Sequence, residues 1–231
     1  MFRMCFCLFI SLRLFSTVSA QSQVHDFYVN YSVDIDSDQS MISLLSIGTS
    51  VEVAFKGAFS KTNIRLAGGS NKISMVADNN AVIATVLLDI VEGKKAFQMD
   101  ASKRTEMETA LQKIGENPMR YTDSYKNIAG YDCQKVFMKH LASGANIIVY
   151  LSQQLAPKQD AVFQAFYKQM KGFPLGVVVR KDATTVRIMA TEVQTKLGST
   201  NVFSTKIPEG YEKTTLEAIR DAAEKKYSPT K

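Results

Sequence analysis

The amino-acid sequence predicts one α+β domain, in which an antiparallel β-sheet carries about three helices. Short segments with alternating apolar and polar residues recur along the chain, which is the pattern of strands with one wet face. The turns between them are too short for parallel crossovers and favour antiparallel neighbours. Three other segments repeat apolar residues at helical spacing. No linker or internal repeat divides residues 21–231, so all these elements are assigned to a single domain.

The first twenty residues, MFRMCFCLFISLRLFSTVSA, have the organisation of a secretory signal peptide. A basic residue, Arg3, precedes an apolar run, and small residues lead up to Ala20, where a signal peptidase would cut. The alternative is an N-terminal membrane anchor, but Arg13 interrupts the apolar run, which is shorter than the ~20 residues that span a bilayer. We therefore expect residues 1–20 to be removed on export, leaving residues 21–231 without a transmembrane segment.

Strands account for most of the mature chain. In FYVNYSVDID the apolar residues alternate with polar ones, and VEVAFKGAF repeats the pattern as a second strand. The segment 82–91 is apolar on both faces, so this strand should be central or covered by another layer. The remaining strands are expected at residues 63–66, 72–77, 95–99, 119–124, 131–140, 146–152, 175–180, 185–197 and 201–204.

Three helices are expected between and after these strands. The segment ASKRTEMETALQKIGE has one apolar stripe, and either Asp100 or Ser102 can cap its start. The segment 158–171 carries its aromatic residues at the same spacing. Thr214 and Glu217 form a capping-box pattern that predicts a third helix near the C-terminus.

Cys133 is the only cysteine that remains after removal of residues 1–20, so the mature chain cannot form an internal disulfide. A reactive thiol usually has a basic neighbour, a helix N-terminus or a second cysteine that stabilises its thiolate. Cys133 instead lies in a predicted strand between Asp132 and Gln134, with Lys135 as the next basic residue. Because a free cysteine packs as a small hydrophobic residue, we expect Cys133 to be structural.

The segment DIDSDQSMISLL places Asp34, Asp36 and Asp38 at positions 1, 3 and 5 of an EF-hand-like calcium loop. Such a loop needs a glycine at position 6 and a bidentate glutamate at position 12, and Gln39 and Leu45 occupy those positions here. The aspartates also fit the wet face of the first strand. Neither a metal nor another cofactor is therefore expected.

Catalytic and nucleic-acid-binding patterns are missing from the sequence. Nucleophile elbows, zinc-protease helices and phosphate-binding loops do not occur, and His25 and His140 form no recognisable pair. The formal charge of +6 comes from basic residues spread along the chain, whereas a nucleic-acid site concentrates them. These observations favour a non-enzymatic protein without a nucleic-acid partner. An enzyme whose catalytic groups meet only in the folded chain is the weaker alternative.

Four segments occur in an order that resembles a known family: YTDSYKNIAGYDCQKVFMK, VYLSQQLAP, KGFPLGVVV and FSTKIPEGY. Together they resemble an uncharacterised family of exported bacterial proteins, classed as a domain of unknown function, over residues 27–212. The closing segment and the order of strands and helices are also similar to the periplasmic lipoprotein carriers LolA and LolB. The resemblance to the carriers implies a strongly curved antiparallel sheet, an incomplete barrel, with helices on its concave face.

In the carriers that concave face accepts acyl chains. The resemblance therefore implies an exported protein of the periplasm or cell envelope of a Gram-negative bacterium, which binds a hydrophobic or lipidic ligand or a lipidated protein. The alternative is an interaction module with a filled core, whose partner docks on an edge strand or a loop. The expected cavity-lining residues are Val53, Phe55, Ile73, Met75, Val86, Leu88, Phe163, Phe166 and Met170.

Overall fold

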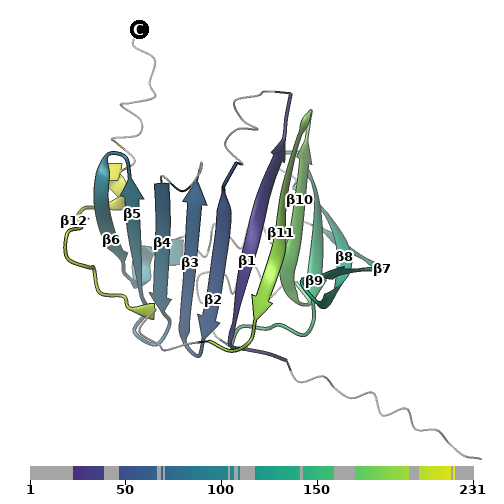
Figure 1. Ribbon diagram of the computed structural model, residues 1–231, viewed down its shortest axis with the longest axis horizontal. Coiled ribbons are helices and arrows are strands. Elements are labelled where there is room, and N and C mark those ends of the chain that lie inside the picture. Colours follow the sequence, from purple (N-terminus) through teal and green to yellow (C-terminus); the bar gives the residue numbers. More distant parts are fainter. Residues whose placement is uncertain are drawn as a thin grey trace, which may run out of the picture.

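A computed structural model describes residues 23–38, 47–66, 69, 71–103, 105–106, 109, 118–140, 143–158, 170–197, 203–219 and 221. These residues form one twelve-stranded sheet in the order β12-β6-β5-β4-β3-β2-β1-β11-β10-β9-β8-β7 (Figure 1). The strands are β1 Phe27–Asp36, β2 Ser50–Lys56, β3 Phe59–Leu66, β4 Asn71–Asp78, β5 Ile83–Ile90, β6 Gly93–Met99, β7 Met119–Ile128, β8 Tyr131–Lys139, β9 Asn146–Ser152, β10 Phe173–Lys181, β11 Thr184–Gln194 and β12 Glu212–Lys213.

The chain builds this sheet from two meanders. The first runs outward from β1 to β6, and the second runs from β7 to β11, which returns to pair with β1. Every pair of neighbours is antiparallel except β12 and β6, which are parallel, so the sheet is mixed. β1 (purple in Figure 1) is therefore the strand where the two meanders meet, and it pairs with β2 on one side and β11 on the other.

The sheet is curved and open. β7 and β11 contact each other although β8, β9 and β10 lie between them in the sheet, so the second meander curls back on itself. Figure 1 shows β8 to β10 turning away from the plane of β2 to β6. The two ends of the sheet, β12 and β7, do not pair with each other, so the described strands do not close into a barrel.

The prediction of an α+β domain with three helices is wrong. Strands dominate the described residues, and helical residues occur there only in two short segments, which begin at Ala101 and Leu216. The predicted helix at 158–171 lies almost entirely outside the described residues. The sequence pattern undercounted strand because several strands extend into polar residues that alternation alone does not mark, as in β7, which continues to Ile128.

Two further strand predictions are corrected. The run VEVAFKGAF is not one strand, because Gly57 adopts a positive φ of 57° and turns the chain between β2 and β3. The strand expected at 201–204 is not formed at its described end, where Phe203 lies in a 3₁₀ turn. The chain instead reaches the sheet at β12, and the Thr214 backbone N–H donates to the Ala96 carbonyl oxygen at 2.8 Å.

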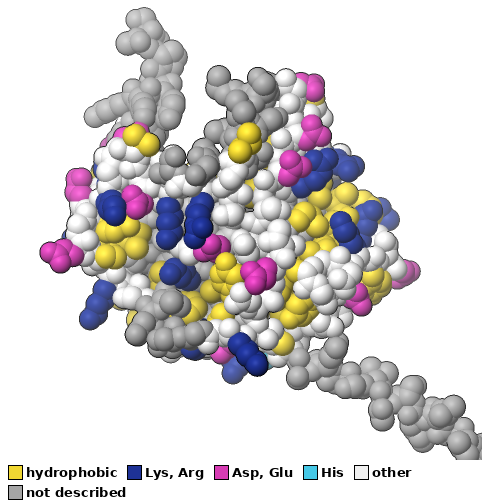
Figure 2. All heavy atoms as spheres, in the orientation of Figure 1, with side chains coloured by type: hydrophobic (Ala, Val, Ile, Leu, Met, Phe, Trp, Pro, Cys, Tyr) yellow, Lys and Arg dark blue, Asp and Glu magenta, His cyan; other side chains and the backbone are white. Residues whose placement is uncertain are grey.

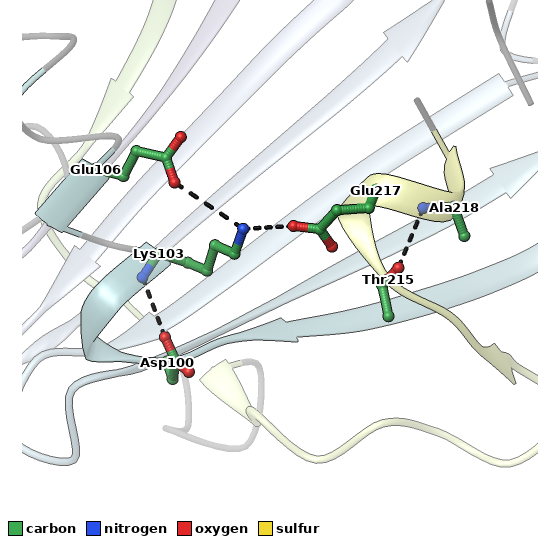
Figure 3. A network of polar contacts seen from close by, with 6 residues as sticks. All are labelled: Asp100, Lys103, Glu106, Thr215, Glu217 and Ala218. Carbon is green, nitrogen blue, oxygen red and sulfur yellow. Dashed lines mark hydrogen bonds and ion pairs between the residues drawn. The ribbon is translucent and has the colours of Figure 1, made fainter. Parts of the chain in front are cut away.

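The two helical segments are joined by a polar network (Figure 3). Asp100 caps the first segment, as one of the two predicted alternatives, by accepting from the Lys103 backbone N–H at 3.0 Å. The prediction that Thr214 and Glu217 form a capping box is wrong. The hydroxyl of Thr215 caps the second segment instead, by accepting a hydrogen bond from the Ala218 backbone N–H at 3.1 Å. The Glu217 carboxylate instead accepts from the Lys103 ammonium, which lowers the pKa of Glu217 and ties the segments together.

Among the described residues, the buried hydrophobic side chains form three clusters. The first centres on the rings of Phe27, Phe55 and Phe173, whose centroids lie 4.9 to 5.6 Å apart. The second covers β4, β5 and β6, where Ile219 of the C-terminal segment packs against it. The third covers β8 and β9 and includes Met170. We call the face of β2–β6 that carries the second cluster the inner face and the opposite one the outer face.

Candidate functional site

Six of the sequence-predicted cavity residues lie together on the inner face of β2, β4 and β5. Their cross-strand neighbours place them in adjacent rows, because Met75 pairs with Val86 and Ile73 pairs with Leu88. Met170 is buried in the separate cluster over β8 and β9, so the structure does not bring it together with the others. Phe163 and Phe166 lie outside the described residues. The six residues on the inner face are Val53, Phe55, Ile73, Met75, Val86 and Leu88.

The inner face is graded from buried to partly exposed along its strands. At one end Phe55, Ala77, Ala84 and Met99 are almost completely buried. Four residues farther along, toward the β3–β4 and β5–β6 turns, a row of four aliphatic side chains is only half-buried. This upper inner row consists of Val51, Ile64, Ile73 and Leu88, which pair across the strands in that order. Part of the apolar surface of these four side chains is therefore exposed.

Exposed hydrophobic residues surround the same end of the sheet. Leu66 ends β3 and is 37% exposed, and Val91 in the β5–β6 turn is 82% exposed. The Asn71 side chain accepts from the Val91 backbone N–H at 3.2 Å, so the two turns are held side by side. Ile47, which precedes β2, is 63% exposed. We call Ile47, Leu66 and Val91 the apolar rim, and both turns lie at the top of Figure 1.

A pocket of about 210 Å³ lies on the outer face of β1, β2 and β3. Its floor is a cross-strand row in which Ala54 lies between Tyr28 and Lys61. Two apolar side chains from beyond β11, those of Leu197 and Phe203, also line it. The lining residues are Tyr28, Glu52, Ala54, Lys61, Asn63, Leu197 and Phe203.

Phe203 and Thr205 hold the chain against the outer face of the sheet beside the pocket. Phe203 is 2% exposed, and its ring lies 6.2 Å from that of Phe59. Two residues later, the Thr205 carbonyl oxygen accepts from the Thr85 hydroxyl at 2.6 Å and from the Gln98 amide at 3.2 Å. Thr85, on β5, is therefore buried on the outer face as well, and β5 lies between β4 and β6, which agrees with the expectation that this strand is central or covered by another layer.

A hydrogen-bonded chain of polar side chains forms one wall of the pocket. The Glu52 carboxylate accepts from the Asn63 amide at 3.0 Å and forms an ion pair with Arg65 at 3.0 Å. The Ser74 hydroxyl donates to the Asn63 amide oxygen at 2.8 Å. Glu52 thus has its charge compensated within the wall. Sequence analysis missed this pocket, because an outward lysine, glutamate and asparagine on strands look like an ordinary wet face.

The surroundings of the pocket shift the pKa of two of its groups, Tyr28 and Lys61. Burial, followed by the charges of Glu52 and Glu192, raises the pKa of Tyr28. Burial, followed by the neighbouring charge of Lys72, lowers the pKa of Lys61. The charge of Glu52 opposes this lowering only in part, and among the described residues Lys61 forms no ion pair.

Cys133 is buried, as predicted. Its thiol donates to the Tyr131 carbonyl oxygen at 3.4 Å, and the side chain belongs to the first core cluster. Burial, with a smaller contribution from Asp132, raises the pKa of Cys133 from 9.0 to about 11. Because the thiolate is the nucleophile, the folded chain disfavours thiol chemistry at neutral pH.

We expect the Cys133 thiol to react with Ellman's reagent at least 100-fold more slowly in the folded protein at pH 8 than in urea. The raised pKa also predicts that stability declines as the pH rises from 9 to about 11, because the unfolded chain releases the thiol proton first. The Cys133→Ser variant serves as the control in both measurements. Rapid stoichiometric labelling of the folded protein would contradict this assignment.

Two aspartates of the calcium-loop pattern, Asp34 and Asp36, form ion pairs. The Arg187 guanidinium lies 2.8 Å from Asp34 and 3.7 Å from Asp36. In the described part of the chain, no group of three or more histidine, cysteine, aspartate and glutamate side chains gathers to hold a metal ion.

No described helix combines the length and apolar character required to cross a bilayer.

Basic side chains also lie over aromatic rings on β7–β9. The Arg120 guanidinium is 4.7 Å from the Phe137 ring centroid, Lys135 is 4.8 Å from the same ring, and Lys126 is 5.5 Å from Tyr150. Figure 2 shows lysine and arginine side chains beside hydrophobic ones at this end of the molecule.

Comparisons with known proteins identify no family. No protein-family model matches the chain, and no curated protein matches it in sequence. Two structures of PNGF-II, in space groups C2 and P21, align with 85% of this chain at 12% and 11% identity and TM-scores of 0.46 and 0.45. The chain spans about a third of PNGF-II, 32% of its length.

A third solved structure is a beta-barrel-like protein of the domain of unknown function DUF1849 from Brucella abortus. It aligns with 75% of this chain and 98% of its own, at 9% identity and a TM-score of 0.37. At these scores, none of the three likenesses says what this chain binds. The resemblance to the lipoprotein carriers stays a prediction.

Proposed function

We propose that this chain is a non-enzymatic, exported binding protein whose inner face takes the hydrocarbon part of a hydrophobic or lipidic ligand. The observation that carries the proposal is the upper inner row, where four neighbouring aliphatic side chains are half-buried, whereas Phe55, Ala77 and Ala84 at the other end of the same face are almost completely buried. Because about 25 cal/mol is gained for each Å² of apolar surface buried, a hydrocarbon chain laid along this row would supply useful affinity.

The apolar rim supports a route for such a ligand. Exposed side chains at the end of β3, in the β5–β6 turn and before β2 surround the end of the sheet where the inner face is least buried. Clustered exposed hydrophobic residues commonly mark a binding surface. A ligand arriving from a membrane or a lipidated protein would meet the rim before it meets the upper inner row.

Native mass spectrometry of residues 21–231 with palmitate tests the proposal. We expect a saturable mass increase corresponding to one palmitate. The variant Leu88→Gln should weaken this binding by about tenfold or more, because a polar group would then face the hydrocarbon. The absence of a palmitate complex with the wild-type protein would overturn the proposal and favour an interaction module with a filled core.

The matched control is Leu87→Gln. Leu87 and Leu88 are neighbours on β5, both are half-buried, and their side chains lie on opposite faces of the sheet. Leu87→Gln should therefore leave palmitate binding unchanged. Equal losses in the two variants would mean that the effect comes from destabilised β5 and not from the inner face, and would contradict the proposal.

A further inference from the structure

The outer pocket plays no part in the proposed lipid-binding function. We propose that it is a separate binding site for a small carboxylate that carries an apolar group. The occupant's carboxylate would bind Lys61 and Tyr28, and its apolar group would contact Leu197 and Phe203.

The shape of the pocket follows from one small residue. Ala54 lies directly between Tyr28 and Lys61 in a cross-strand row, so the two long side chains flank a space that a larger residue would fill. Leu197 and Phe203 cover that space from the chain after β11. Its volume of about 210 Å³ is below the ~300 Å³ at which pockets for drug-sized ligands begin. The pocket therefore suits a small ligand and not an acyl chain.

The charges around the pocket favour an anion. The carboxylate of Glu52 is already bound by Arg65 and Asn63 in the wall. Lys61 has no ion-pair partner among the described residues, and Lys72 lies near enough to disfavour its charged form. A ligand carboxylate would supply the missing partner in a partly desolvated place, where a charge-assisted hydrogen bond is stronger than at the surface.

Tyr28 provides a second recognition group. Its hydroxyl forms no hydrogen bond with the described residues, although the side chain lines the pocket. Burial and the nearby glutamates raise its pKa, so the phenol keeps its proton and can donate to an acceptor. The pocket is therefore lined by two hydrogen-bond donors, the phenol of Tyr28 and the ammonium of Lys61, which can bind the two oxygens of a carboxylate.

NMR titration of the ¹⁵N-labelled protein with benzoate tests this site. We expect saturable shifts of the backbone signals of Tyr28, Ala54 and Lys61. Benzamide, which has the same ring without the charge, should bind at least tenfold more weakly. Lys61→Met should weaken benzoate binding at least tenfold, and Ala54→Leu should abolish it by filling the pocket. Circular dichroism melting confirms that each variant is folded.

Lys72→Met is the matched control, because Lys72 lies on the same outer face, where it pairs with Arg65, and its charge acts on Lys61, but it does not line the pocket. It should retain benzoate binding within about threefold. Equal losses from the two lysine variants, benzamide binding as tightly as benzoate, or no saturable shift with benzoate would each overturn the proposal. Palmitate binding should be unaffected by Lys61→Met, so failure here is distinguishable from failure of the inner-face function.

Discussion

Replacing Phe55 with alanine is expected to reduce the free energy of unfolding by about 3 to 5 kcal/mol, the range for removing a buried phenylalanine. Phe55 is 1% exposed, and its ring contacts those of Phe27 on β1 and Phe173 on β10. It therefore belongs to the first meander and packs against a strand of the second. Its removal leaves a cavity at the place where the two meanders share a core.

Urea unfolding followed by far-ultraviolet circular dichroism measures this effect. Phe137→Ala is the control, because Phe137 is only half-buried on β8 and contacts the cations of Arg120 and Lys135. We expect the control to cost about 1 kcal/mol or less, as is usual for partly exposed positions. A loss below 1 kcal/mol for Phe55→Ala would show that the aromatic cluster does not join the meanders. Two separate transitions in the wild-type protein would lead to the same conclusion.

The strands were largely readable from the sequence because alternation is a local property. β1 and β9 occupy the segments that their patterns indicated, and Cys133 is buried in β8 as its neighbours suggested. The pairing of β1 with β11 could not be read in the same way. It joins residues that are 149 to 166 positions apart, from Asp36 with Thr185 to Tyr28 with Gln194, and the alternation within a strand does not indicate which strand it pairs with.

The helices and the outer pocket could not be predicted from the sequence in this way. An apolar repeat predicts which face a helix would bury but not how many residues become helical, and only short helical segments occur among the described residues. β12 has two residues, too few for any period. The outer pocket is lined by Phe203 together with Ala54 and Lys61, which are distant from it in sequence. The inner-face residues were predictable because they are apolar at every second position.

The second large effect is expected from Gly172, which precedes β10. Its φ of 142° is rarely adopted by other residues, and a Cβ atom at this position would lie 2.6 Å from the Ser152 carbonyl oxygen and 3.0 Å from its carbonyl carbon. Both atoms belong to the backbone of β9, so no side-chain rotation relieves the clash. Gly172→Ala should therefore reduce the free energy of unfolding by about 2 to 4 kcal/mol, within the range for strain at a special backbone position.

Gly144→Ala separates the two causes of this loss. Gly144 also has a positive φ, of 71°, but a Cβ atom there would meet nothing within 4 Å. We expect this control to cost about 1 kcal/mol, from backbone strain alone. The difference between the two variants in urea unfolding then measures the clash with Ser152. Because Ser152 pairs with both Phe173 and Cys133, a clash there disturbs β8, β9 and β10 together, and equal losses in the two variants would disprove that close approach.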